Sequence, residues 1–211
     1  VPISIPTIMA KAIETNAKSA LAYYNLGGVY RKMGQLDIAL ENLNKSIELD
    51  PQYGESYSYR ADILLKKGQL KEALVDSTKA IELNSQNTTA YIIRGYVYTI
   101  QGKFEQAIVD YTKSIEINPQ EICTYVFRGD AYQANGQLER ALADYNMALE
   151  INASEPIIYN KRGCIFLKKG ELDLALTDFN SAISINSQYE EAYNNRGYVY
   201  QEKLKLKKAL E

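Results

Sequence analysis

The sequence predicts an all-α solenoid of stacked antiparallel helical hairpins, because three columns of residues recur with one period of 34 residues. The glycine column is Gly34, Gly68, Gly102, Gly136 and Gly170. The tyrosine column is Tyr23, Tyr57, Tyr91, Tyr125, Tyr159 and Tyr193, and the alanine column is Ala39, Ala73, Ala107, Ala141, Ala175 and Ala209. A fixed period in this range is typical of repeat proteins, in which each unit buries its apolar face only by stacking on its neighbours.

Each unit is expected to contain two helices joined by a turn. Counted from Ala20 as position 1, apolar or small residues at positions 4, 7, 8 and 11, such as Tyr23 and Tyr30, form one face of a first helix. Glycine at position 15 favours the left-handed conformation that ends a helix. A second amphipathic helix follows, often with an acidic residue at position 18 near its start. Pro51 and Pro119, at position 32, lie just beyond its end.

Small residues at positions 8 and 20 are expected to let two helix backbones approach closely. An aromatic residue at position 24 is expected to fill the space between successive hairpins. Position 24 holds Tyr111, Tyr145 and Phe179 in the third, fourth and fifth units.

These columns resemble those of the tetratricopeptide repeat (TPR), and the resemblance covers nearly the whole chain. It implies a right-handed superhelix, with an array over 20–211 made of units 20–53, 54–87, 88–121, 122–155 and 156–189 and a partial unit 190–211 that stops within its second helix. Residues 1–19 are interpreted as an N-terminal extension, with 7–19 as the second helix of a preceding half-unit. Leu204 replaces the position-15 glycine in the last unit. We expect the sequence to be part of a longer protein.

Positions 7 and 23 vary together within the chain. The four full units with arginine at position 7 have aspartate at position 23, whereas the first unit has the neutral pair Leu26 and Asn42. The charged pairs are Arg60 with Asp76, Arg94 with Asp110, Arg128 with Asp144 and Arg162 with Asp178. We predict an ion pair between the two helices of each hairpin. The alternative is that recent duplication preserved both residues without any contact.

Composition excludes several classes of function. The chain has no histidine, which removes Ser-His and Cys-His nucleophile pairs and histidine metal sites. A net charge of -2 argues against electrostatic binding of nucleic acid. No apolar run is long enough to span a bilayer, and the first residues lack a signal-peptide pattern. The two cysteines are 41 residues apart, which fits a reducing compartment better than a disulfide. We therefore expect a cytoplasmic protein without catalytic activity, cofactor, metal or membrane insertion.

The other side of the first helices, at positions 2, 5, 6, 9, 12 and 13, is expected to be free. In proteins that resemble this one, that side lines a concave groove that binds peptides. The candidate peptide-binding residues are apolar in the third and fourth units and polar toward the C-terminus, where asparagine could bond a peptide backbone. They are Ile92, Ile93, Tyr96, Ile100, Cys123, Val126, Phe127, Asp130, Asn160, Lys161, Asn194 and Asn195.

The sequence thus predicts a protein-binding scaffold that takes a peptide or an amphipathic helix of a protein partner in this groove. Three alternatives stay open. The chain could form a homo-oligomer through uncapped ends that include Leu206 and Leu210, or it could be the regulatory arm of a larger enzyme or complex. Neighbouring first helices could also bury part of the apolar set.

Overall fold

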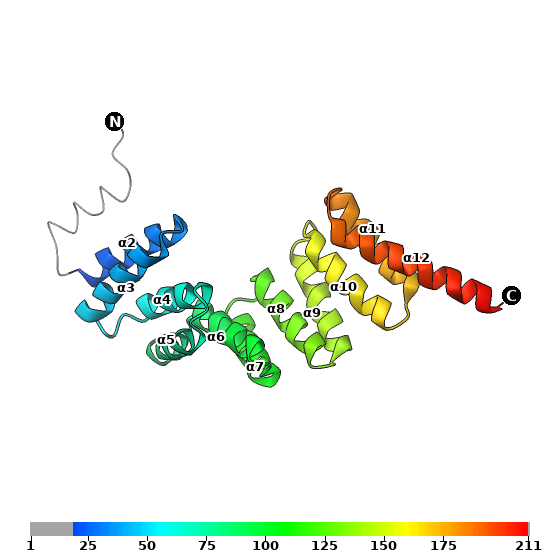
Figure 1. Ribbon diagram of the computed structural model, residues 1–211. Coiled ribbons are helices and arrows are strands. Elements are labelled where there is room, and N and C mark those ends of the chain that lie inside the picture. The colour runs from blue at the N-terminus through cyan, green and yellow to red at the C-terminus, as the bar shows by residue number, and fades with distance from the viewer. Residues whose placement is uncertain (1–18, 211) are drawn as a thin grey trace, which may run out of the picture. The chain divides into compact units, whose positions relative to one another are not determined.

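The computed structural model describes the backbone of residues 19–210 and the side chains of residues 19–208, and its regular structure is entirely α-helical in this range (Figure 1). The described helices are α2 (Ala20–Lys32), α3 (Leu36–Leu49), α4 (Gly54–Lys66), α5 (Leu70–Leu83), α6 (Thr88–Ile100), α7 (Phe104–Ile117), α8 (Ile122–Ala134), α9 (Leu138–Ile151), α10 (Pro156–Lys168), α11 (Leu172–Ile185) and α12 (Glu190–Leu210).

Five consecutive pairs of helices pack as hairpins, which confirms the predicted solenoid of helical hairpins. The pairs are α2 with α3, α4 with α5, α6 with α7, α8 with α9 and α10 with α11. The predicted preceding helix at 7–19 lies outside the described residues, apart from Ser19. Ser19 caps α2, because its side chain accepts a hydrogen bond from the Ala22 amide.

The glycine at position 15 ends each first helix in the way that the sequence predicts. Gly34 has a φ of 75°, and the Gln35 amide donates to the Tyr30 carbonyl at 2.9 Å while the Gly34 amide donates to Arg31 at 3.1 Å. This pair of bonds is a Schellman motif, which satisfies carbonyls that the helix end leaves open. The chain then turns directly into the second helix.

The last unit differs from the prediction, because α12 is one continuous helix of 21 residues. No turn and no second helix occur between Glu190 and Leu210. Leu204 stands where the other units have glycine, and a leucine side chain disfavours the left-handed conformation. The expectation of a partial second helix in this unit was therefore wrong for the described residues.

The chain divides into two compact units, of which unit 1 ends at Asn118 and unit 2 begins at Pro119. In unit 1, α3 packs on α4 and α5 on α6, while α2 contacts α4 and α4 contacts α6. In unit 2, α9 packs on α10, α11 packs on α12, and α10 contacts α12. The first helices α2, α4 and α6 therefore lie side by side in unit 1, as do α10 and α12 in unit 2.

From α4 onward, positions 3 and 10 of the first helices are fully or almost fully buried, although the sequence analysis did not select them. Examples are Ala90 and Val97 in unit 1 and Ile158 and Ile165 in unit 2. Both positions lie on the first helix at a spacing of seven residues, so they form one stripe along it. This stripe adds to the face at positions 4, 7, 8 and 11.

The aromatic residue at position 24 lies against the glycine of its own hairpin, and Phe179 also packs in one buried cluster with Val199 of the next repeat, as expected for a residue between successive hairpins. A Cβ added to Gly129 would lie 2.7 Å from Cε1 of Tyr145, and one added to Gly163 would lie 2.7 Å from Cε1 of Phe179. The glycine therefore leaves the space that the ring occupies.

Candidate functional site

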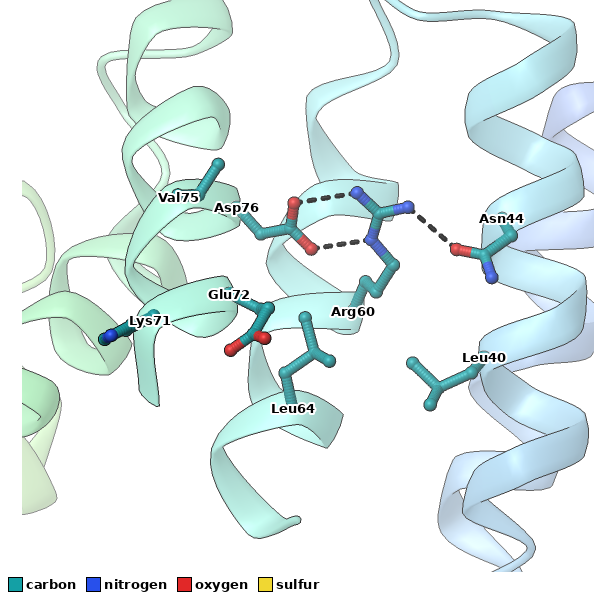
Figure 2. Close-up of a pocket in the computed structure, with 8 residues that line it drawn as sticks. All are labelled: Leu40, Asn44, Arg60, Leu64, Lys71, Glu72, Val75 and Asp76. Atoms are coloured by element: carbon teal, nitrogen blue, oxygen red, sulfur yellow. Dashed lines mark hydrogen bonds and ion pairs between the residues drawn. The ribbon is translucent and has the colours of Figure 1, made fainter. Parts of the chain in front are cut away.

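The predicted arginine–aspartate pairs form in all four full units that have them. Arg60 donates from Nε and Nη2 to the two carboxylate oxygens of Asp76, at 2.6 and 2.8 Å (Figure 2). Arg94 and Asp110 make the same two bonds, at 2.8 and 2.7 Å. So do Arg128 with Asp144 and Arg162 with Asp178. Each pair joins the first and second helix of one hairpin, so the predicted contact is confirmed.

Two of these arginines, Arg60 and Arg162, also reach back to the preceding repeat. Nη1 of Arg60 donates to Asn44 Oδ1 at 2.7 Å, and Nη1 of Arg162 donates to Asn146 Oδ1 at 2.7 Å. The hydrogen bonds to Asp76 and Asp178 raise the pKa of these two guanidinium groups above its ordinary value, although burial opposes the shift. The arginine therefore stays charged and fixes three helices relative to one another.

A cavity of about 500 Å³ opens beside one of these pairs, between α3, α4 and α5 (Figure 2). Its lining residues are Leu40, Asn44, Arg60, Leu64, Lys71, Glu72, Val75 and Asp76. The Arg60 guanidinium is bonded to Asp76 and Asn44, so it belongs to the packing between helices. We assign this cavity a structural role.

The first-helix side of unit 1 begins with a cluster of aromatic rings. The ring of Tyr24 lies 4.7 Å from that of Tyr59 and 5.2 Å from that of Tyr53. The guanidinium of Arg31 lies 4.5 Å above the Tyr59 ring and forms an ion pair with Asp62. Charged and aromatic side chains of α2 and α4 therefore form a connected surface.

Farther along this side, α6 presents the apolar residues that the sequence selected. Tyr96 and Ile100 are 40% and 51% exposed, and Ile92 is half-buried one turn earlier. Because these three residues are spaced by four, they form one stripe on the helix. Ile93 is only 4% exposed, so the expectation that its side chain is free was wrong.

In unit 2 the first-helix side combines apolar and polar side chains. Cys123 is exposed on α8, whereas Val126, Phe127 and Asp130 are half-buried. Asp130 accepts hydrogen bonds from the Tyr145 hydroxyl at 2.7 Å and from the Lys161 ammonium at 2.9 Å. Burial, followed by the charge of Asp130, raises the pKa of Tyr145 well above its ordinary value. The hydroxyl therefore stays protonated and donates to the carboxylate.

Sequence reasoning missed this link between α8, α9 and α10. The sequence analysis predicted only a packing role for Tyr145, and Tyr145 and Asp130 are 15 residues apart in the sequence. The signal available in the sequence was that Tyr111 and Tyr145 have a hydroxyl at position 24 where Phe179 has none.

A cavity of about 360 Å³ lies beside this cluster. It is lined by Asp130, Gln133, Ala134, Asn160, Lys161, Cys164, Lys168 and Glu191. Both signs of charge and several amide groups face one space, which suits hydrogen bonding to a polar chain more than burial of an apolar one.

The three asparagines of the candidate site have different surroundings. Asn195 donates from Nδ2 to Asn160 Oδ1 at 3.0 Å, and Asn160 is only 2% exposed. The expectation that Asn160 is free was therefore wrong, because the neighbouring first helix covers it. Asn194 is exposed.

The thiol of Cys123 is expected to react slowly with alkylating reagents. Partial burial of its sulfur, together with the hydrogen bond from Sγ to Glu121 Oε1 at 3.1 Å, raises its pKa to about 11, although the residue as a whole is exposed. At pH 8 roughly a thousandth of the thiol is then ionised, against about a quarter for an ordinary cysteine. In a Cys164→Ser background, iodoacetamide should therefore modify Cys123 about a hundredfold more slowly than it modifies free cysteine.

The rate should rise about tenfold per pH unit between pH 8 and 10, because the thiolate is the reactive form. Glu121→Gln should accelerate the reaction at pH 8, since it removes the negative charge beside the sulfur. A rate at pH 8 equal to that of free cysteine would contradict this assignment.

The described range contains neither a candidate metal site nor a helix suited to span a membrane. No group of three or more Cys, Asp or Glu side chains in residues 19–208 could hold a metal ion. None of the helices α2–α12 is long and apolar enough to cross a bilayer.

Comparisons with known sequences agree with the fold. Profiles described as tetratricopeptide repeat match residues 20–53, 89–121 and 42–75, and a profile described as TPR repeat matches 129–170 and 163–203. No curated protein matches the chain in sequence.

Several solved structures are similar in fold. YrrB, a TPR protein with an unusual peptide-binding site, is 22% identical, with a TM-score of 0.73 over 90% of this chain and 97% of that chain. MamA is 22% identical, with a TM-score of 0.70 over 78% of this chain and 96% of that chain. For pilF of Pseudomonas aeruginosa the identity is 18% and the TM-score 0.75, over 90% of this chain and 91% of that chain.

At these identities the structures show a common fold and no more. The matching profiles fall on the hairpins described above, and they cover parts of both units. The chain belongs to the tetratricopeptide repeat family, whose members generally act as scaffolds for protein–protein interaction.

Proposed function

We propose that this chain is a non-catalytic scaffold that binds a peptide or an amphipathic helix of another protein along its first helices. The observation that supports the proposal most directly is the exposed apolar stripe of α6. Tyr96 and Ile100 lie on the side where first helices neighbour one another, and each is at least 40% exposed.

The stripe suits an apolar side chain of a partner. A tyrosine and an isoleucine one turn apart offer a large contact area at low cost in conformational entropy. The aromatic cluster of α2 and α4 lies on the same side of unit 1, and its Arg31–Asp62 pair adds polar groups beside the rings. Apolar anchors surrounded by polar groups are typical of interfaces whose affinity depends on a few residues.

The first helices of unit 2 offer polar contacts of their own to a peptide. Lys168, Glu191 and Asn194 are exposed around or beside the cavity described above. An extended peptide offers one donor and one acceptor per residue, which amide and charged side chains can match. That YrrB has a peptide-binding site in the same fold supports this reading by analogy.

We also propose that the protein works in the cytoplasm and without nucleic acid. Its two cysteines are both free in the structure, and the pKa of Cys164 is raised by burial and by Glu191, as that of Cys123 is raised by its surroundings. Cysteines that form no disulfide are typical of reducing compartments. The net charge of -2 argues against a general attraction to phosphates.

The test is to select peptides from a displayed library on the wild-type chain and to measure their affinity for a Tyr96→Asp, Ile100→Asp variant by calorimetry. We expect the dissociation constant to rise at least roughly tenfold, because two carboxylates replace the apolar contact. Ile93 is not used, since a charge at a buried position would test folding instead.

Val109→Asp is the matched control. Val109 is also apolar, belongs to the same unit and is 67% exposed, but it lies on the second helix α7. Its substitution should change the dissociation constant less than about twofold. Equal losses in the two variants, or no loss in either, would contradict a binding site on the first helices.

A further inference from the structure

The first helices of unit 1 carry more positive than negative charge. Helices α2, α4 and α6 together contain five arginines and lysines but only two acidic residues. Two of the arginines are bonded to the aspartates of their own hairpins, as described above. The other three cations are Arg31, Lys32 and Lys66, and each lies in the last turn of its helix. The unmatched charge is therefore concentrated at one end of these helices.

A single carboxylate on these helices faces the three cations. Asp62 forms ion pairs with both Arg31 and Lys66, the latter at 2.8 Å. The other acidic residue, Glu55, lies in the first turn of α4, at the opposite end of that helix. Lys32 and Lys66 are both exposed. Because three cations share one carboxylate, this end keeps a net positive charge that a partner can reach.

Helices α2 and α4 run parallel and level with each other. Near their starts, the ring of Tyr24 lies 4.7 Å from that of Tyr59, and near their ends Arg31 pairs with Asp62. The two residues of each contact differ by one and by three repeat positions, so the helices are level within one turn. Helix α6 packs beside α4 in the same way along the repeat. Equivalent positions of the three helices therefore form rows across them.

The row at position 13 combines charge with an apolar side chain. It consists of Lys32, Lys66 and Ile100, and all three are exposed. Ile100 also belongs to the apolar stripe of α6 described above. The axes of neighbouring packed helices are about 8–10 Å apart. A partner that follows the row therefore meets two cations and then an apolar side chain, at steps of about 8–10 Å.

A polyproline II helix has a period that matches these steps. It has three residues per turn and rises about 3.1 Å per residue, so residues i, i+3 and i+6 lie on one side at intervals of about 9 Å. A β-strand would place residues i and i+3 on opposite faces. An amphipathic α-helix buries a continuous apolar stripe, whereas two of the three side chains in this row are lysines. The row therefore suits an extended acidic peptide better than a helix.

We infer that the first helices of unit 1 bind an extended peptide in the polyproline II conformation, with acidic residues at i and i+3 and an apolar residue at i+6, or the same pattern in reverse order. Each acidic residue pairs with one of Lys32 and Lys66, and the apolar residue packs on Ile100 beside Tyr96. The inference rests on the proposed function and narrows its partner to one class of peptide.

The test is a selection from a displayed library of random linear peptides on two proteins, the wild-type chain and a Lys32→Glu, Lys66→Glu variant. Peptides selected on the wild type should carry Asp or Glu at i and i+3, with an apolar residue at i+6 or i-3. Peptides selected on the variant should carry Lys or Arg at the two charged places, because the charges of the surface are reversed. Both substituted lysines are exposed, so the variant keeps the fold.

A labelled peptide with the wild-type consensus is then measured by fluorescence anisotropy. Its dissociation constant should rise at least roughly tenfold on the Lys32→Glu, Lys66→Glu variant, since attraction becomes repulsion at two places. Lys45→Glu, Lys79→Glu is the matched control, because it changes the net charge equally but on the second helices α3 and α5. The control should change the dissociation constant less than about twofold.

Proline substitutions in the consensus peptide test its conformation. Proline at the places between the acidic residues should change the dissociation constant less than about threefold, because its fixed φ suits polyproline II. Acidic residues selected at i and i+7, in peptides that proline inactivates, would indicate an α-helix and contradict the extended form. An oligouridylate that binds the wild type and loses affinity equally in the lysine variant would assign the cations to nucleic acid instead of a peptide.

The Tyr96→Asp, Ile100→Asp variant separates failure of this inference from failure of the proposed function. Peptides that lose affinity for that variant but carry no acidic pair would leave the proposed function in place and overturn the inference. The same result follows if the wild type and the lysine variant select the same peptides. Acidic peptides that bind the Tyr96→Asp, Ile100→Asp variant as tightly as the wild type, or a selection that yields no peptide, would overturn both.

Discussion

Replacement of Asp110 by alanine is expected to lower the free energy of unfolding by about 3 kcal/mol. Asp110 is buried and accepts two hydrogen bonds from Arg94, whose side chain is one-fifth exposed. Without the carboxylate, the guanidinium stays charged in a site that water reaches only from one side. We place the effect at the low end of the range for broken buried pairs because of this partial exposure. Urea denaturation followed by far-ultraviolet circular dichroism measures it.

The first repeat supplies the matched control. It has Leu26 and Asn42 in place of the charged pair, and Asn42 bonds the Ile38 carbonyl of its own helix at 2.7 Å. A double variant with Arg94→Leu and Asp110→Asn should therefore regain most of the lost stability, since no unpaired charge remains. If Asp110→Ala alone costs less than about 1 kcal/mol, the pair is no more than a surface ion pair.

Replacement of Gly129 by alanine is expected to lower the free energy of unfolding by about 1–3 kcal/mol. The added methyl group would lie 2.7 Å from the Tyr145 ring, which is fully buried and bonded through its hydroxyl to Asp130. The ring cannot move away without breaking that bond or opening the hairpin. In an exposed helix the same substitution would stabilise by about 1 kcal/mol, so the clash has to exceed that gain.

Gly197→Ala is the matched control for Gly129→Ala, because Gly197 occupies the same repeat position and its added Cβ meets nothing within 4 Å. We expect this variant to be more stable than the wild type by about 0.5–1 kcal/mol. Chemical denaturation of both variants, with amide exchange in α12 to detect local opening, provides the test. Opposite signs at the two glycines support the role of the ring, and equal signs would show that the contact is not what requires glycine.

The sequence alone predicted the hairpin of each full repeat and its ion pair, because both depend on residues close together in the chain. The helix faces follow from periodicity, and the end at Gly34 follows from a conformation that glycine adopts easily. Arg94 and Asp110 are 16 residues apart, on two helices that one short turn holds together. Because the turn is short, two co-varying residues on these helices can meet in only a few arrangements. The structure has the predicted one, an ion pair between the two helices.

Only the tertiary structure decided which first-helix side chains are accessible. Ile93 and Asn160 belong to the set predicted to be free, yet both are buried. Their burial depends on how closely neighbouring first helices approach, which no single repeat encodes. The contact between Tyr145 and Asp130 likewise required the position of the second helix over the first. Local patterns in this chain determine the repeating element, whereas the surface that can bind a partner depends on packing between repeats.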